Sequence, residues 1–112
     1  MKFIATTMEM VRGDSETVSV WLEDDNGHAP FVTGDTVYFT VKQDKFSTEK
    51  AFQKTVTTFV DGKAFVDILP ADTKNMEFGR YFYDVQITFA NGEVKTIVPC
   101  SQFVLKCEVT YE

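Results

Sequence analysis

The segment RYFYDVQITF, residues 80–89, alternates strictly between two sets of side chains and is the clearest indication of the fold. One set is Tyr81, Tyr83, Val85, Ile87 and Phe89, and residues 80, 82, 84, 86 and 88 form the other. A β-strand turns successive side chains to opposite faces, so a period of two predicts a strand with one apolar face. We therefore expect this strand to lie over a core.

The same alternation recurs in four further segments. It gathers Val18, Val20 and Leu22; Val37, Phe39 and Val41; Ala64, Val66 and Ile68; and Phe103, Leu105, Cys107 and Val109. The segment 2–10 is rich in Thr and apolar residues and is expected to be a strand too. Asp61-Gly62 and Asn91-Gly92 separate strand-like runs, and each pair predicts a tight hairpin. Hairpins join antiparallel strands, so antiparallel pairing is expected throughout.

The segment LPADTKNMEFG, residues 69–79, breaks the alternation. Pro70 suits the first turn of a helix and Gly79 suits its exit, so this segment predicts one short helical turn that crosses between two sheets. Seven to nine short strands with one crossover predict an all-β antiparallel sandwich, with residues 1–112 forming a single domain. The loop at 43–51 is the most irregular stretch and is expected to be mobile.

Composition narrows the classes of protein to which the chain can belong. It has 112 residues, of which 44% are hydrophobic and 14% aromatic, and this is too apolar for a disordered segment. A net charge of −6 repels phosphate backbones and anionic membrane surfaces, so we expect no nucleic-acid partner. No apolar run is long enough to span a bilayer, and the start MKFIATT is too weakly apolar for a secretion signal.

The residues that usually carry chemistry are sparse. Cys100 and Cys107 would lie roughly 23 Å apart on an extended strand, at ~3.3 Å per residue, so both are expected to be free thiols. The single histidine, His28, lies in a turn, and the acidic segment EDDNG at 23–27 lacks the ligand spacing of a calcium loop. No glycine-rich phosphate loop is present. We therefore predict no catalytic residue, no cofactor and no metal site, and the chain is not expected to be an enzyme.

Residues 12–14 spell Arg-Gly-Asp, the tripeptide that integrins read on adhesive proteins. Adhesive use requires the tripeptide at a protruding loop tip, but an alternating strand begins here by Thr17. Gly13 is better interpreted as a bend or bulge that leads into this strand.

The best candidates for an interface are aromatic residues on the outward faces. If the alternating apolar sets point inward, then Trp21, Tyr38, Phe65 and Phe82 point outward from four different strands. Gathered on one sheet, they would form a patch suited to a partner. The alternative is that they divide between the two sheets, or that loops and terminal strands cover some of them.

The order of these motifs is familiar as a whole. The strand-opening RGD is followed by VYFTVK (37–42), DGKAFVDILPADT (61–73), GRYFYDVQI (79–87) and NGEVKTI (91–97). The chain resembles the Ig-like domain family at the N-termini of tailed-phage baseplate upper proteins, and related small prophage structural proteins. The family pattern matches Pro70, Asp72, Thr73, Gly79, Tyr81, Tyr83 and Asp84.

The resemblance implies an Ig-like sandwich in which these seven residues form a structural corner. Asp72 and Thr73 would cap the crossover turn, and Tyr81 or Tyr83 would bond a backbone group nearby. It also implies a non-enzymatic structural protein of a phage tail or baseplate, made in the bacterial cytoplasm and incorporated into a virion. Its partners would be other phage structural proteins or further copies of itself, with no membrane insertion. The alternative is a carbohydrate-binding or adhesive β-sandwich module, because sandwich folds host many functions.

Overall fold

The structure, a computed structural model, describes residues 7–24, 27–44, 46 and 48–109, with the backbone alone described at 23, 24 and 27–29. Nine strands and one short helix occur in these residues. The elements are β1 (Met8–Val11), β2 (Glu16–Val20), β3 (Leu22–Asp24), β4 (Gly27–Ala29), β5 (Thr36–Lys42), β6 (Phe52–Val56), β7 (Ala64–Ile68), α1 (Pro70–Thr73), β8 (Gly79–Thr88) and β9 (Val94–Lys106). The prediction of an all-β chain with one short helical turn is confirmed.

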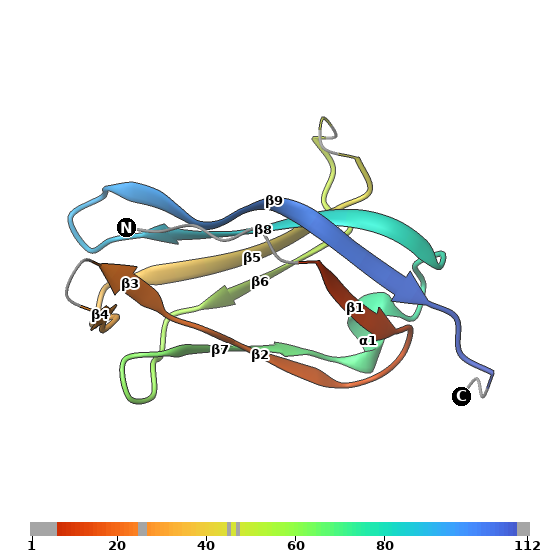
Figure 1. The fold of residues 1–112 in the computed structure, drawn as a ribbon, viewed down its shortest axis with the longest axis horizontal. Coiled ribbons are helices and arrows are strands. Elements are labelled where there is room, and N and C mark those ends of the chain that lie inside the picture. Colours follow the sequence, from red (N-terminus) through yellow and green to blue (C-terminus); the bar gives the residue numbers. More distant parts are fainter. Residues whose placement is uncertain (1–6, 25–26, 45, 47, 110–112) are drawn as a thin grey trace.

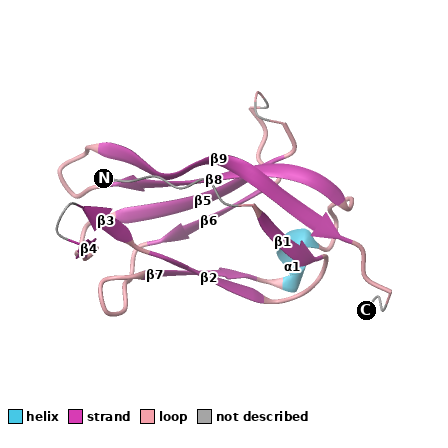
Figure 2. Cartoon of the chain, in the orientation of Figure 1, coloured by secondary structure: helices cyan, strands magenta, loops and turns pink. Residues whose placement is uncertain are grey.

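The strands form two layers, drawn one above the other in Figure 1. The large sheet has five strands in the order β1-β9-β8-β5-β6 and curls over the small sheet, which has only β2 and β7. A separate hairpin, β3–β4, lies at one end. Figure 2 shows the single helix at the other end, between the two layers.

The large sheet is mixed, so the prediction of purely antiparallel pairing was wrong. β1 runs parallel to β9, with Met8 opposite Phe103 and Val11 opposite Lys106, while the other pairs of the large sheet are antiparallel. The turn after β1 leads the chain into β2 of the other sheet. β1 therefore has no hairpin partner and pairs with the last strand of the chain instead.

The two predicted hairpins have different outcomes. Asn91-Gly92 joins β8 to β9 as expected, and the Phe89 N–H donates to the Glu93 carbonyl at 2.8 Å across this turn. At Asp61-Gly62 the turn forms, because Val60 and Lys63 exchange both backbone hydrogen bonds, at 3.0 and 2.9 Å. However, β6 belongs to the large sheet and β7 to the small one, so this turn links the layers and the predicted hairpin was wrong.

The crossover between the sheets is confirmed. α1 begins with Pro70 and joins β7 of the small sheet to β8 of the large sheet. The helix ends at Thr73, so Gly79 is not its exit and instead begins β8. The described part of the 43–51 loop contains neither helix nor strand, in agreement with its irregular sequence.

The core lies between the layers. Buried side chains include Val20, Leu22, Val37, Phe39, Val41, Ala64, Val66, Ile68, Tyr81, Tyr83, Val85, Ile87, Phe103 and Leu105. The predicted inward faces are thus confirmed for most positions, but Cys107 and Val109 are exposed. The alternation continues in sequence there, yet β9 ends at Lys106, where β1 stops and β8 no longer runs alongside. Past that point no described strand shields the side chains.

Four aromatic rings form a closed circuit in this core. The centroid of the Phe39 ring lies 5.4 Å from that of Tyr83 and 6.2 Å from that of Phe52. The centroid of the Phe103 ring lies 6.0 Å from that of Phe52 and 6.4 Å from that of Tyr83. Aromatic pairs prefer such offset and edge-on separations. The circuit therefore links four strands of the large sheet, β5, β6, β8 and β9, through their core-facing side chains.

Candidate binding surfaces

The four outward aromatics divide between the two sheets and do not form one patch. Tyr38 on β5 and Phe82 on β8 lie on the outer face of the large sheet, and both are half-buried. Phe65 lies on β7 and Trp21 directly follows β2, so these two belong to the small sheet. They are 41% and 38% exposed, so part of each ring is accessible to a partner, although other large apolar residues are more exposed.

Trp21 and Phe65 are neighbours on the small sheet. Ser19 pairs with Phe65 and Val20 with Ala64, so Trp21 lies diagonal to Phe65, about 7 Å away between backbones. The Lys63 ammonium lies 5.5 Å from the centroid of the Trp21 ring. A cation over an aromatic face is attracted by the ring, which helps to fix this indole.

The same surface continues along β7. Thr17 pairs with Asp67 and its hydroxyl donates to that carboxylate at 2.9 Å. Leu69, two residues beyond Asp67, is 52% exposed and extended in backbone conformation. We call Trp21, Phe65 and Leu69, with Thr17, Lys63 and Asp67, the small-sheet face. It combines apolar area with polar groups at its rim, as protein interfaces do.

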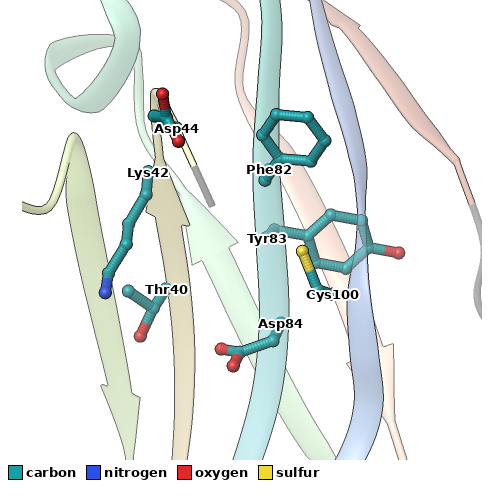
Figure 3. Close-up of a pocket in the computed structure, with 7 residues that line it drawn as sticks. All are labelled: Thr40, Lys42, Asp44, Phe82, Tyr83, Asp84 and Cys100. Atoms are coloured by element: carbon teal, nitrogen blue, oxygen red, sulfur yellow. The ribbon is translucent and has the colours of Figure 1, made fainter. Parts of the chain in front are cut away.

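A shallow hollow lies on the outer face of the large sheet. Figure 3 shows Thr40 and Lys42 on β5, Phe82 and Asp84 on β8, and Cys100 on β9. Asp44 and Tyr83 complete its lining, and its volume is about 110 Å³. Ligand pockets commonly measure about 300–1,000 Å³, so this hollow fits one small group and not a whole metabolite.

Two ionisable groups that line the hollow, Asp84 and Tyr83, have raised pKa values. Burial raises the pKa of the Asp84 carboxyl, and the nearby Lys42 ammonium partly opposes this effect. The phenol of Tyr83 likewise has a raised pKa, because it is buried, while its hydrogen bond with Ser101 works in the other direction. The Cys100 thiol is exposed and free. None of the lining side chains is a histidine, so Cys100 has no imidazole base among them.

The Arg-Gly-Asp tripeptide forms an internal turn between β1 and β2. The Asp14 N–H donates to the Val11 carbonyl at 3.1 Å, and Gly13 has φ of 85°, which favours glycine. The Gly13 N–H donates to the Thr73 hydroxyl at 2.9 Å. The tripeptide thus joins the first turn of the chain to the crossover helix.

Arg12 binds inside the domain. Its guanidinium donates to both oxygens of Glu108, with the shortest bond at 2.7 Å, and to the Met76 carbonyl at 3.0 Å. It also lies 5.4 Å from the centroid of the Phe78 ring. This arrangement lowers the pKa of Glu108, chiefly through the hydrogen bonds from Arg12. An external receptor would have to break these contacts to reach the arginine.

Of the seven residues assigned to the structural corner, Asp72 and Tyr81 bond the backbone around the crossover. The Asp72 carboxylate accepts the Leu69 N–H at 2.7 Å, which caps the start of α1. Thr73 is fully buried, but its hydroxyl bonds the Gly13 turn and does not cap the crossover. The Tyr81 hydroxyl donates to the Glu77 carbonyl at 2.6 Å.

The remaining corner residues have other surroundings. Pro70 is exposed at the first position of α1, and Gly79 is exposed at the start of β8. Tyr83 belongs to the aromatic circuit. Asp84 lines the hollow on the opposite face of β8. Tyr83 and Asp84 therefore lie outside the corner.

Two structural interactions were not predicted from the sequence. The first is the Arg12–Glu108 pair, whose members lie 96 positions apart. The second is Asp35, which is buried and accepts backbone N–H groups from Val32 at 2.9 Å and Ala90 at 3.1 Å. For the second interaction the sequence offers one indication, the dipeptide Gly34-Asp35, because Gly and Asp favour turns and Asp in a turn often bonds nearby backbone.

The predictions for His28 and for the acidic segment at 23–27 fall on side chains outside the described residues. Among the side chains that are described, no group of three or more His, Cys, Asp or Glu residues is arranged to hold a metal ion. Within the same residues, no helix is long and apolar enough to cross a membrane. A scan against protein-family models finds no match to the chain, and a search of curated proteins finds no relative.

Proposed function

We propose that this chain is a non-enzymatic protein-interaction module that serves as a structural component of a phage or prophage particle, in the tail or baseplate. The observation that carries the interaction role is the exposed Trp21–Phe65 pair on the small-sheet face. Aromatic residues at the centre of a polar-rimmed patch contribute most of the binding energy in many interfaces. The phage setting rests on the motif resemblance.

The strand order supports an Ig-like sandwich as part of this proposal. Variable-type Ig sandwiches place their strands G, F, C and C′ side by side in one sheet and B beside E in the other. Here β9, β8, β5 and β6 take the places of G, F, C and C′, and β2 and β7 take those of B and E. These six strands also follow one another along the chain in the order B, C, C′, E, F, G. The Tyr81 hydroxyl bonds the backbone four residues upstream, as the tyrosine corner of such folds does.

In this role the partners are other structural proteins of the particle or further copies of this chain. Assembly would begin in the cytoplasm of the bacterial host and end in the virion. Symmetric particles repeat the same contact many times, so even a modest patch contributes strongly to assembly.

A second candidate is a carbohydrate-binding module. The specific observation in its favour is the hollow beside Phe82, where Thr40, Lys42 and Asp84 offer hydrogen-bonding groups next to an aromatic ring. Its volume of about 110 Å³ would hold one small group of a sugar, and the rest of the glycan would lie outside the hollow. This role would use the outer face of the large sheet, so it can be separated from the first by mutation.

The test compares matched variants of the two faces. The chain is co-expressed with the products of the genes beside its own, and complexes are measured by sedimentation velocity. Trp21→Ser with Phe65→Thr is expected to weaken complex formation or self-association by at least about a hundredfold, since hot-spot residues contribute about 2 kcal/mol or more each. Phe82→Ser is the control and should leave assembly unchanged.

Two results would overturn the proposal. One is an unchanged sedimentation profile for the double variant while its circular dichroism remains native. The other is binding of cell-wall sugars, measured by glycan array, that is lost in Phe82→Ser and retained in the double variant. The second result would favour the carbohydrate role.

A further inference from the structure

The small sheet has an unprotected edge. It contains only β2 and β7, and Figure 1 shows no third strand beside them among the described residues. Two-stranded sheets are marginal on their own, and an edge strand presents a row of unpaired N–H and C=O groups. β2 pairs with β7 through all five of its residues, so its other side is open.

The two edge strands of the large sheet carry features that discourage pairing, but β2 does not. On β6, Lys54 points toward the core side, opposite Phe39, and bonds Asp72 at 2.8 Å. An inward-pointing charge on an edge strand is a known means of preventing edge-to-edge association. β1 has only four residues, and its Glu9 forms an ion pair with Lys106 at 3.1 Å. The segment Glu16–Val20 has no lysine, no proline and no bulge.

The backbone of β2 is available for pairing. In an antiparallel ladder alternate residues direct both their N–H and C=O to the same side, so about half of the five residues point away from β7. Within the described residues, the backbone bonds that Glu16–Val20 make lie in the β2–β7 ladder. Val18 is only half-buried although it packs against the core, so a further strand would complete its burial.

We propose that β2 is a docking edge that accepts an extended segment of a partner protein as a third strand of the small sheet. This inference rests on the proposed interaction role, because the added strand would lie next to the Trp21–Phe65 pair. Strand addition uses main-chain hydrogen bonds for affinity and alternate side chains for specificity. The partner segment is therefore recognised mainly by its extended conformation.

The charges and side chains around β2 define the chemistry of that segment. The chain carries a net charge of −6, and exposed Asp14 and Glu16 lie at the start of β2. This acidic surface disfavours a second copy of the chain and favours a basic segment. Inner-facing positions of the segment would meet Glu16, Val18 and Val20, so those beside the two valines should be β-branched. Its outward positions would lie on the face that carries Asp67 of β7, so they suit basic residues. The fitting partner is a segment of alternating β-branched and basic residues.

The experiment uses a short synthetic peptide of alternating valine and lysine as the probe, and the full chain as the target. Backbone amide hydrogen exchange is measured across β2, with the peptide at about ten times its dissociation constant, so exchange of the outward-pointing amides should slow by about tenfold. A matched peptide with alternate amides N-methylated keeps the side chains and charge but blocks the ladder, and it should give no protection. A peptide of alternating valine and glutamate tests the charge requirement, and it should also give no protection.

The outcomes separate this inference from the proposed function. Equal protection by the N-methylated peptide, protection of β1 or β6 and not β2, or no binding would overturn strand docking. Slow exchange in β2 that depends on the concentration of the free chain would point to a second copy as the occupant and would also overturn it. If docking fails while assembly still depends on Trp21 and Phe65, the proposed function stands without it.

Discussion

Replacing Gly62 with alanine tests how the turn at Asp61-Gly62 holds the two layers together. Gly62 has φ of 73°, a conformation that L-residues rarely adopt, and a Cβ there would lie 2.7 Å from the Pro30 Cβ and 3.0 Å from its Cα. Gly92 is the matched control, because its φ is 91° and a Cβ would meet nothing within 4 Å. Both substitutions strain the backbone, but only one produces a clash.

The magnitude follows from these contacts. A left-handed conformation costs an L-residue about 1–2 kcal/mol, and both variants share this penalty. Carbon atoms normally pack at about 3.5–4.0 Å, so the alanine methyl at 62 must push the segment at Pro30 away. That movement stretches the bond from the Phe31 N–H to the Gly62 carbonyl, now 3.0 Å, which contributes about 1 kcal/mol. We expect a total destabilisation of about 2.5 kcal/mol for Gly62→Ala and about 1.5 kcal/mol for Gly92→Ala.

Thermal unfolding followed by circular dichroism measures the difference. At about 4 °C per kcal/mol for a domain of this size, the melting temperature should fall by roughly 10 °C for Gly62→Ala and 6 °C for Gly92→Ala. Equal losses in the two variants would refute the reasoning, because the contact with Pro30 would then contribute nothing. A larger loss in Gly92→Ala would refute it as well.

Two further predictions concern the buried carboxylate of Asp35 and the half-buried carboxylate of Asp84. Asp35→Asn should destabilise the domain by about 1–3 kcal/mol in urea unfolding, because an amide has one acceptor oxygen for the two N–H groups of Val32 and Ala90. An unchanged urea midpoint of unfolding would contradict this. Burial raises the pKa of Asp84, so the folded state holds the carboxyl proton more tightly than the unfolded state. The stability of the fold should therefore fall as the pH rises from the ordinary carboxyl pKa of 3.8 through the raised pKa of the folded state. Asp84→Asn should remove that loss. The melting temperature of the variant minus that of the parent should therefore increase between pH 3 and pH 7, the range in which carboxyls with an ordinary or raised pKa titrate. A constant difference would contradict the assigned cause.

Local periodicity allowed most of the fold to be predicted. The alternation in β5, β7 and β8 identified which side chains are buried, because a two-residue period is a direct property of an extended backbone. The turn at Asp61-Gly62 was also found, but its neighbours separate into different sheets. The conformation of a turn depends on its own residues, whereas the sheet that each flanking strand joins depends on which distant strand pairs with it.

The pairing of β1 with β9 was not predictable for the same reason. Their registered residues lie 95 positions apart, from Met8 opposite Phe103 onward, and nothing in the local sequence of either strand specifies a parallel partner. The candidate interface shows the same limit. Alternation placed Trp21, Tyr38, Phe65 and Phe82 on outward faces, but only sheet membership divides them into two pairs. The charge of Arg12 likewise gave no indication that Glu108 would be its partner.

The parallel arrangement of β1 and β9 determines how the domain would bear mechanical load. A pull applied between Met8 and Lys106, at the opposite ends of the two paired strands, acts along the strands and across all of their shared hydrogen bonds at once. Such shearing requires the bonds to break together, whereas a hairpin pulled at its open end unzips one bond at a time. The aligned strands β1 and β9 therefore give the domain resistance to a pull along their length.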